Sequence, residues 1–160
     1  MKFTTTLLAV RDMDRSLEFY RDLFGQKVVC DLGWNKTLTC GLTLQLNFDK
    51  LCEFPEEKMQ FRSHNMELYF ETEDIDAFVK LLSEHPEVEC LHNLKQYPWR
   101  QRVIRIFDPD GHIIEVGESM ESVAFREFAA GHSVQETAEI IQHPPALVQQ
   151  WHDNYRQEQK

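Results

Sequence analysis

The chain has 160 residues, enough for one domain with its own core, and its 42% hydrophobic and 28% charged residues are typical of a globular protein. A formal net charge of −10 argues against nucleic acid or an anionic membrane surface as a main partner, because both repel an acidic protein. The four cysteines form no Cys-x-x-Cys pair, the N-terminus does not resemble a signal peptide, and no apolar run is long enough to span a bilayer. We therefore expect a cytoplasmic protein whose thiols are reduced and mostly buried.

The first half of the chain is expected to form a strand, a helix and three further strands. Residues 3–10 alternate with a period of two, as in a strand. Residues 13–23 repeat apolar side chains at helical spacing, with Asp12 as the N-cap and Gly25 as the C-cap. Three short extended segments follow, around residues 27–31, 36–40 and 43–48.

The second half repeats this order after a polar segment, residues 49–63, that we interpret as a linker. Residues 66–72 alternate as a strand, and residues 75–83 repeat apolar side chains at helical spacing after Asp74. Further extended segments are expected near residues 89–94 and 102–107, with a last strand after them.

The last two strands are joined by an Asp-Pro-Asp-Gly sequence, a strong turn signal. We pair residues 107 and 112 across this turn, which places Glu115 opposite Ile104. Arg102 then lies on the same face of the sheet as Glu115.

The two halves are internal repeats. The helix of each half opens with Asp-x-Asp, at residues 12–14 and 74–76. If a pseudo-twofold axis relates the repeats, four side chains at equivalent positions of the strands point toward one shared pocket. They are Thr5, Gln45, Glu67 and Glu115.

Residues 119–160 form a separate helical element, with helices expected at 120–130 and 134–141 and a third through Leu147 and Trp151. The segment superficially resembles a helix-turn-helix. It carries three basic and six acidic side chains, however, and a net charge of −3 is the wrong sign for a DNA-binding element. We interpret it as a helical arm that packs on its own domain or on a neighbouring subunit.

Two segments carry a family resemblance: Asp-Met-Asp-Arg-Ser-Leu-Glu-Phe-Tyr at residues 12–20 and Phe-Asp-Pro-Asp-Gly-His-Ile-Ile-Glu at residues 107–115. With the repeat, they make residues 1–118 resemble the vicinal oxygen chelate superfamily, which includes glyoxalase I, bleomycin-resistance proteins and extradiol dioxygenases. The resemblance implies an α+β fold in which two βαβββ modules, at about residues 1–50 and 64–118, form a curved mixed sheet with an open cavity. A C-terminal helical extension, residues 119–160, would follow, and the resemblance also implies a homodimer.

The resemblance further implies where a metal ion would bind. Glu115 matches the family's terminal carboxylate ligand, whereas Glu67 stands where a His is usual, Gln45 where glyoxalase I has Glu, and Thr5 where His or Gln is usual. Glu67, Glu115 and Gln45 are therefore candidate ligands of a divalent cation (Mg, Mn, Ni or Zn), and Glu115 and Glu67 are the candidate catalytic residues. The alternative is that no metal binds and that these side chains line a wet cavity. A two-His-one-carboxylate iron site is not available, so extradiol dioxygenase activity is not expected.

Five side chains are candidates for contacting a substrate: Arg102, Trp99, Trp34, Tyr69 and Thr5. Arg102 either holds an anionic group or forms a structural pair with a glutamate on the cavity rim. The two tryptophans either stack on a planar ligand or pack as ordinary aromatic residues. Thr5 is expected to be a pocket wall, because a neutral hydroxyl is a poor metal ligand.

The leading hypothesis is a protein, similar to glyoxalase and bleomycin-resistance proteins, that binds a small polar organic molecule in a sheet-lined cavity. If it is an enzyme, the resemblance implies metal-dependent isomerase or lyase chemistry, in which the metal polarises substrate oxygens and a free Glu moves the proton. A second hypothesis is a metal-free protein that sequesters its ligand. A third is a protein-interaction module formed by the helical arm.

Overall fold

The computed structural model describes residues 1–158, so residues 159–160 of the expected extension lie outside the described residues. The chain divides into two units. The first unit comprises Met1–Leu68, Leu81–Glu89 and Ile106–Ile113, and the second comprises Tyr69–Lys80, Cys90–Arg105 and the chain from Ile114 onward.

One four-stranded sheet is built from the first half of the chain, with the order β1-β4-β3-β2. Its strands are β1 (Leu7–Ala9), β2 (Val28–Asp31), β3 (Asn35–Leu38) and β4 (Thr43–Gln45). β1 pairs with β4 in parallel, whereas β3 pairs with both β4 and β2 in antiparallel orientation. The sequence predicts all four strands, the first from alternation and the others as short extended segments, although β1 is shorter than the expected strand at residues 3–10.

Helix α1 (Met13–Phe24) begins and ends where the sequence predicts. The Asp12 carboxylate accepts a hydrogen bond from the backbone N–H of Arg15, 3.1 Å away, which satisfies a donor that the first helical turn leaves unpaired. Gly25 ends the helix with a φ of 63°, a left-handed conformation that a residue with a Cβ rarely adopts. Both predicted caps are therefore confirmed.

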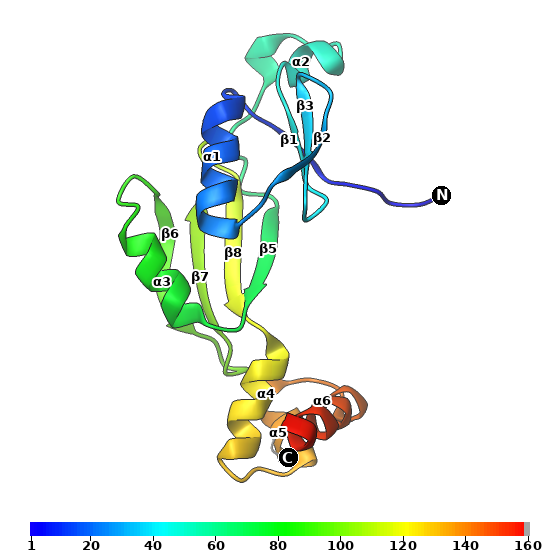
Figure 1. Cartoon of the computed structure of the whole chain (residues 1–160), viewed down its shortest axis with the longest axis vertical. Helices are drawn as coiled ribbons and strands as arrows, with labels where there is room; N and C mark the ends of the chain where they lie inside the picture. Colours follow the sequence, from blue (N-terminus) through cyan, green and yellow to red (C-terminus); the bar gives the residue numbers. More distant parts are fainter. Residues whose placement is uncertain (159–160) are drawn as a thin grey trace. The chain divides into compact units, whose positions relative to one another are not determined.

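The second sheet has the order β5-β8-β7-β6 and is built from the second half of the chain (Figure 1). Its strands are β5 (Glu67–Thr72), β6 (Cys90–Gln96), β7 (Arg102–Phe107) and β8 (Ile113–Glu118), and helix α3 (Ile75–Ser83) connects β5 to β6. Ile104, Ile114 and Val116 of the central strands are buried. The order of a strand, a helix and three strands in each half confirms the α+β fold with two βαβββ modules.

Three helices follow β8: α4 (Met120–Ala129), α5 (Val134–Ile141) and α6 (Pro145–Glu158). They enclose a hydrophobic cluster of Val123, Ala124, Phe128, Ala138, Ile141 and Val148. Ser133 and Glu136 form a capping box at the start of α5, in which the Glu136 carboxylate accepts from the Ser133 N–H at 2.8 Å. The C-terminal helical extension is thus confirmed and has its own core. That it packs on a neighbouring subunit stays a prediction.

Two expectations need correction. The segment interpreted as a linker, residues 49–63, contains short helical elements, since α2 spans Phe48–Leu51 and η1 spans Glu56–Lys58. The cysteines are free thiols, as expected, but most are exposed rather than buried, because they lie on an edge strand and in turns: Cys30, Cys40 and Cys52 are exposed and Cys90 is partly covered. Among the described residues, no helix combines the length and the apolarity that crossing a membrane requires.

Tyr20 and Asp108 form a buried hydrogen bond in the first unit. Tyr20 is fully buried, and its hydroxyl donates to Oδ2 of Asp108 at 3.1 Å. Burial, and then the charge of Asp108, raises the pKa of Tyr20 well above its ordinary value, so the phenol stays protonated. The other oxygen of Asp108 accepts from the backbone N–H groups of Asp110 and His112, at 3.0 and 2.8 Å. Helix α1 is thereby joined to the turn between β7 and β8.

The substitution Tyr20→Phe removes one donor to this buried carboxylate and keeps the ring. We expect the free energy of unfolding to fall by about 1–3 kcal/mol, because a buried hydrogen bond to a charged group is lost. Urea unfolding measures the loss. Tyr155→Phe is the matched control, since the Tyr155 ring packs against Phe125 and Phe128. Equal losses in the two variants would contradict the role assigned to the bond between Tyr20 and Asp108.

Candidate functional site

The turn between β7 and β8 decides which side chain faces Glu115. The backbone N–H of Asp108 donates to the C=O of His112, 3.0 Å away. Asp108 therefore pairs with His112, whereas the prediction from the sequence pairs residue 107 with His112. Because this shift moves every cross-strand neighbour by one residue, Arg105 lies opposite Glu115.

Arg105 and Glu115 form an ion pair in the second unit. The Glu115 side chain is 11% exposed and the Arg105 side chain 20%, so most of the pair is shielded from water. Arg105 Nη1 also donates to the Tyr97 hydroxyl at 2.6 Å and lies 3.2 Å from His92 Nε2. The prediction that Ile104 lies opposite Glu115 is wrong by one residue.

Arg102 is bound to other carboxylates. Its Nε donates to Oε1 of Glu118 at 2.9 Å, and its Nη1 donates to both carboxylate oxygens of Asp76 at 3.0 Å. Burial alone raises the pKa of Glu118, but hydrogen bonds from Arg126 and Arg102 outweigh that effect and lower the pKa below its ordinary value. Arg102 thus forms a structural pair with a glutamate, as one of its two interpretations anticipates, but the partner is Glu118 rather than Glu115.

Aromatic side chains adjoin the ion pair. Tyr97 and Trp99 stack with their ring centroids 4.6 Å apart. Trp99 Nε1 donates to Oε1 of Gln101 at 2.9 Å, and Gln101 Nε2 donates to the Tyr69 hydroxyl at 2.9 Å. Gly117 permits this packing, since a Cβ at that position would lie 2.8 Å from Gln101 Nε2. Tyr69 and Trp99, two of the predicted substrate contacts, therefore lie in one hydrogen-bonded group.

The hydroxyls of the two tyrosines differ in acidity. Burial, and then a hydrogen bond to Glu71 at 3.0 Å, raise the pKa of Tyr69 to about 12. Burial also acts to raise the pKa of Tyr97, but hydrogen bonds involving Lys95 and Arg105 outweigh it and lower that pKa. Tyr97 is therefore the stronger acid, because its phenolate would face two cations.

Thr5 and Gln45 belong to the first unit, where local hydrogen bonds hold both side chains. Thr5 Oγ1 donates to the C=O of Gly41 at 2.7 Å. The Gln45 amide is buried, accepts from Asn35 Nδ2 at 2.8 Å and donates to the Leu46 C=O at 2.6 Å. Thr5 is thus bound to its own sheet, and its role as a pocket wall stays a prediction.

Trp34 and Glu67 also belong to the first unit, and both are exposed. The four residues expected to share a pocket are therefore divided between the units, since Thr5, Gln45 and Glu67 lie in the first and Glu115 lies in the second. Their convergence on one pocket stays a prediction.

Of the predicted metal ligands Glu67, Gln45 and Glu115, the last two make interactions that compete with a metal ion. The Glu115 carboxylate is paired with Arg105, whose positive charge competes directly with a cation. Both polar atoms of the Gln45 amide are already hydrogen-bonded. Within residues 1–158, no group of three or more His, Cys, Asp or Glu side chains is placed to hold a metal ion. Metal binding stays a prediction that metal analysis tests.

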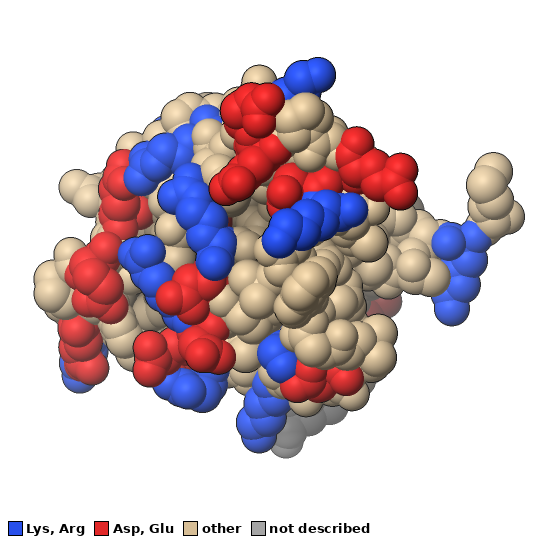
Figure 2. Space-filling view, turned by 90° about the horizontal axis from the view of Figure 1, so that it is seen from above, with Lys and Arg blue, Asp and Glu red and all other residues tan. Residues whose placement is uncertain are grey.

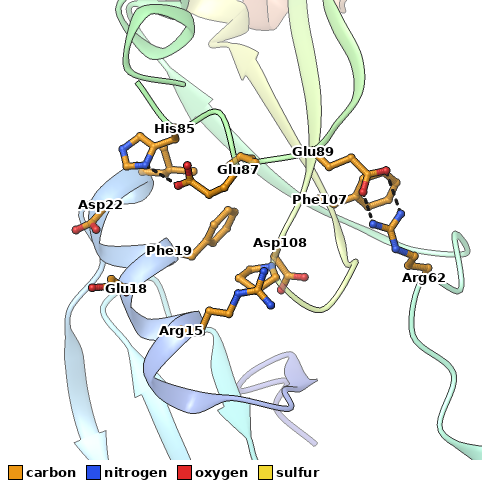
Figure 3. Close-up of a pocket in the computed structure, with 13 residues that line it drawn as sticks. Arg15, Glu18, Phe19, Asp22, Arg62, His85, Glu87, Glu89, Phe107 and Asp108 are labelled. Carbon is orange, nitrogen blue, oxygen red and sulfur yellow. Dashed lines mark hydrogen bonds and ion pairs between the residues drawn. The ribbon is translucent and has the colours of Figure 1, made fainter. Parts of the chain in front are cut away.

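The first unit contains a cavity of about 380 Å³, and none of the predicted site residues lines it. Figure 3 shows the side chains around this cavity. Phe19 points into it from α1. Around it, Arg62 pairs with Glu89, and His85 Nδ1 lies 3.1 Å from Oε1 of Glu87. The side chains of Glu89 and Glu87 are 54% and 68% exposed, whereas that of Glu115 is 11% exposed. The largely buried ion pair between β7 and β8 is therefore the stronger candidate for a functional site.

The surface charge agrees with the overall acidity. Figure 2 shows acidic and basic side chains interspersed over the face in view, without a continuous basic area. The net charge is −10. These features favour the expectation that nucleic acid is not the main partner, which stays a prediction.

Sequence reasoning missed Arg105 and Gln101. Arg105 was missed because the predicted register placed it on the opposite face from Glu115. The signal was present: Gly111, which adopts a φ of 86°, is typical of the last position of a three-residue hairpin loop, and such a loop makes residues 108 and 112 the closing pair. Gln101 carries no comparable signal, because its position depends on contacts with distant strands.

Matches to known proteins agree with this architecture. Residues 3–121 match the model of the glyoxalase-like domain family. A protein of unknown function from Agrobacterium tumefaciens str. C58 is 39% identical, with a TM-score of 0.64, over 74% of this chain and 94% of that chain. A lactoylglutathione lyase from Agrobacterium tumefaciens is 26% identical, with a TM-score of 0.53, over 74% of this chain and 93% of that chain. No curated protein matches the chain.

A glyoxalase/bleomycin resistance protein/dioxygenase family enzyme from Burkholderia phytofirmans PsJN shares the fold, with a TM-score of 0.63 at 12% identity over 72% of this chain and 96% of that chain. The repeated βαβββ order is the architecture of the vicinal oxygen chelate superfamily. Within that superfamily, the chain belongs to the glyoxalase-like domain family. Residues from 122 onward lie outside the family match.

The substitution Arg105→Met leaves the largely buried Glu115 carboxylate without its guanidinium partner. We expect the free energy of unfolding to fall by about 2–3 kcal/mol, near the lower end for buried pairs because both side chains keep some hydration. Adding Glu115→Leu to Arg105→Met should recover most of this loss. Urea unfolding of the wild-type chain, the two single variants Arg105→Met and Glu115→Leu, and the double variant gives the coupling free energy. A value under about 0.5 kcal/mol would contradict the pairing.

Proposed function

We propose that this protein binds a small polar organic molecule with a planar part, without a metal ion, at the ion pair of Arg105 and Glu115. The observation that carries the proposal is a largely buried ion pair bordered by aromatic rings. Buried charged groups are costly to maintain and are often part of binding sites. Rings beside convergent polar groups are the usual lining of small-molecule sites.

The charge of the pair indicates the kind of ligand. Glu115 already neutralises Arg105, so a ligand gains little from a net charge of its own. Beside the pair, the Tyr97 hydroxyl accepts from Arg105, and a hydroxyl can both donate and accept hydrogen bonds. A neutral molecule that carries both a donor and an acceptor therefore complements this face better than an anion or a cation.

The same observations favour binding over turnover. A general base must be available to take a proton, and the Glu115 carboxylate is held by Arg105. The superfamily architecture accommodates both enzymes and binding proteins, so the fold by itself does not choose between them. Sequestration of a ligand requires only the complementarity described above.

A metal-dependent isomerase or lyase is the second candidate. It is favoured by the likeness to a protein named lactoylglutathione lyase, at 26% identity and a TM-score of 0.53. In that case Glu67, Gln45 and Glu115 would hold the ion, which would polarise substrate oxygens. Glu115 would first have to leave Arg105, and this requirement makes it the second candidate rather than the first.

Three probes of equal size and different charge test the proposed ligand class: benzamide, benzoate and benzylamine. We expect benzamide to bind most tightly, because it alone is neutral and carries both a donor and an acceptor. In the double variant Arg105→Met/Glu115→Gln, its dissociation constant should rise about tenfold, since hydrogen bonds to charged groups are lost. Ligand-observed NMR and calorimetry measure the affinities.

Arg15→Met is the matched control for the probe experiment, because Arg15 lines the cavity of the first unit shown in Figure 3. Its affinity for benzamide should equal that of the wild-type chain. Absence of binding by all three probes overturns the proposal, and so does weakening by Arg15→Met in place of the double variant.

Metal analysis separates the two candidates. After dialysis against Mg²⁺, Mn²⁺, Ni²⁺ or Zn²⁺ and then metal-free buffer, we expect the wild-type chain and Glu115→Ala to retain equal, substoichiometric metal by mass spectrometry. The reason is that Glu115 is occupied by Arg105. One equivalent retained by the wild-type chain and lost in Glu115→Ala would establish the metal site and reject the metal-free proposal.

A further inference from the structure

An arginine of α4 joins the helical extension to the second sheet. Helix α4 continues directly from the end of β8 (Figure 1). From this helix, Arg126 donates to Oε1 and Oε2 of Glu118 at 2.8 and 3.2 Å, and to the C=O of Arg100 at 2.9 Å. One guanidinium thus bonds the end of β8 and the turn between β6 and β7 at the same time.

Glu118 gives this contact a defined geometry. Its side chain is 5% exposed, and it also accepts from the backbone N–H of Arg102 at 2.9 Å. A buried carboxylate with several donors has little freedom to move. Glu118 therefore fixes the orientation of the Arg126 guanidinium, which also donates to the Arg100 C=O.

The turn at residues 97–100 needs such support. Arg100 has a φ of 69°, in the left-handed region that residues other than glycine rarely adopt. Strained backbone persists only where surrounding contacts hold it. The Arg100 N–H donates to the Tyr97 C=O at 2.9 Å, and the Arg100 C=O accepts from Gln96 Nε2 at 3.0 Å as well as from Arg126.

The candidate ligand face is formed by the ion pair of Arg105 and Glu115 and the adjoining rings of Tyr97 and Trp99. The turn at residues 97–100 carries both rings. Tyr97 and Trp99 stack within it, and Gln101 follows directly. Gln101 Nε2 donates to the backbone C=O of Glu118 at 2.8 Å and to the Tyr69 hydroxyl at 2.9 Å. Glu118 is therefore bonded to Arg126 through its side chain and to Gln101 through its backbone.

We propose that Arg126 is a positioning residue for the ligand face: by bonding Glu118 and Arg100 together, it fixes the turn at residues 97–100 and so the orientation of Tyr97 and Trp99. The extension beyond the family match then has a role inside the domain that precedes it. The consequence for ligand affinity rests on the proposed function, whereas the effect on the turn does not.

The contact depends on a guanidinium. Its planar fork directs several N–H groups at two acceptors at once, whereas a lysine ammonium is a compact charge on a flexible chain. Arg126→Lys therefore keeps the charge pair with Glu118 and loses the simultaneous bond to Arg100. Arg126→Ala loses both contacts.

Indole N–H signals test the proposal without any ligand. The chain has three tryptophans, one in each relevant part: Trp34 in the first unit, Trp99 in the turn and Trp151 in α6. In the full chain labelled with ¹⁵N-tryptophan, the Trp99 signal is assigned by its loss in Trp99→Phe. We expect Arg126→Ala to shift this signal and to speed exchange of its N–H about five- to tenfold, the effect of losing about one hydrogen bond.

Arg156→Ala is the matched control, because Arg156 is an exposed arginine of α6. It should leave the Trp99 signal and its exchange unchanged, and Trp34 and Trp151 should keep their exchange rates in every variant. Unchanged Trp99 exchange in Arg126→Ala, with Trp151 intact, overturns the proposal. If Arg126→Ala loses the Trp151 signal, Arg126→Lys decides: faster Trp99 exchange supports the proposal, and wild-type exchange overturns it.

Benzamide affinity provides the second measurement. In Arg126→Ala we expect the dissociation constant to rise at least threefold, while Arg156→Ala binds benzamide as the wild-type chain does. If benzamide fails to bind the wild-type chain, the proposed function fails and the indole experiment still decides the role of Arg126. If exchange of the Trp99 indole N–H becomes faster and benzamide affinity does not change, the turn does not contribute to the ligand face. The proposal is then overturned.

Discussion

The hydrogen bond that closes the turn between β7 and β8 is the constraint on which the candidate site depends. Side chains alternate between the faces of a sheet, so a shift of one residue exchanges every neighbour across the hairpin. In the observed register Arg105 meets Glu115 on one face, and Arg102 meets Glu118 on the other. The mostly buried carboxylates of Glu115 and Glu118 thus each have a guanidinium partner, which offsets the cost of burying their charge. The register therefore determines both the chemistry of the proposed ligand face and the attachment of the helical extension.

The same turn explains why two distant sequence motifs occur together. The first motif ends at Tyr20 and the second begins beside Asp108, and these two side chains form a buried hydrogen bond. The Asp108 carboxylate also accepts from two backbone N–H groups of its own turn. A single side chain therefore shapes the hairpin loop and joins it to α1. Residues of both motifs stabilise this turn. The presence of the motifs therefore indicates the fold and says little about the reaction.

The second unit combines a neutralised ion pair, stacked aromatic rings and a strained turn held from α4. The pair supplies polar groups without net charge, and the rings supply a flat apolar wall. The turn at residues 97–100 presents the rings, and Arg126 connects that turn to the end of β8. The proposed ligand face and the helical extension are thereby linked through hydrogen bonds of ordinary length.

The sequence by itself determined the boundaries of α1 and α3, the three terminal helices and the family, because caps, periodicity and contiguous motifs are local features. It also indicated Glu115, Tyr69 and Trp99 as residues of interest. Only the tertiary structure decided which arginine faces Glu115, since that depends on one residue more or less in a hairpin loop. The contact of Arg126 with a carbonyl 26 residues away could not be read from the sequence either. Its geometry arises from the packing of separate elements, and no local pattern encodes that packing.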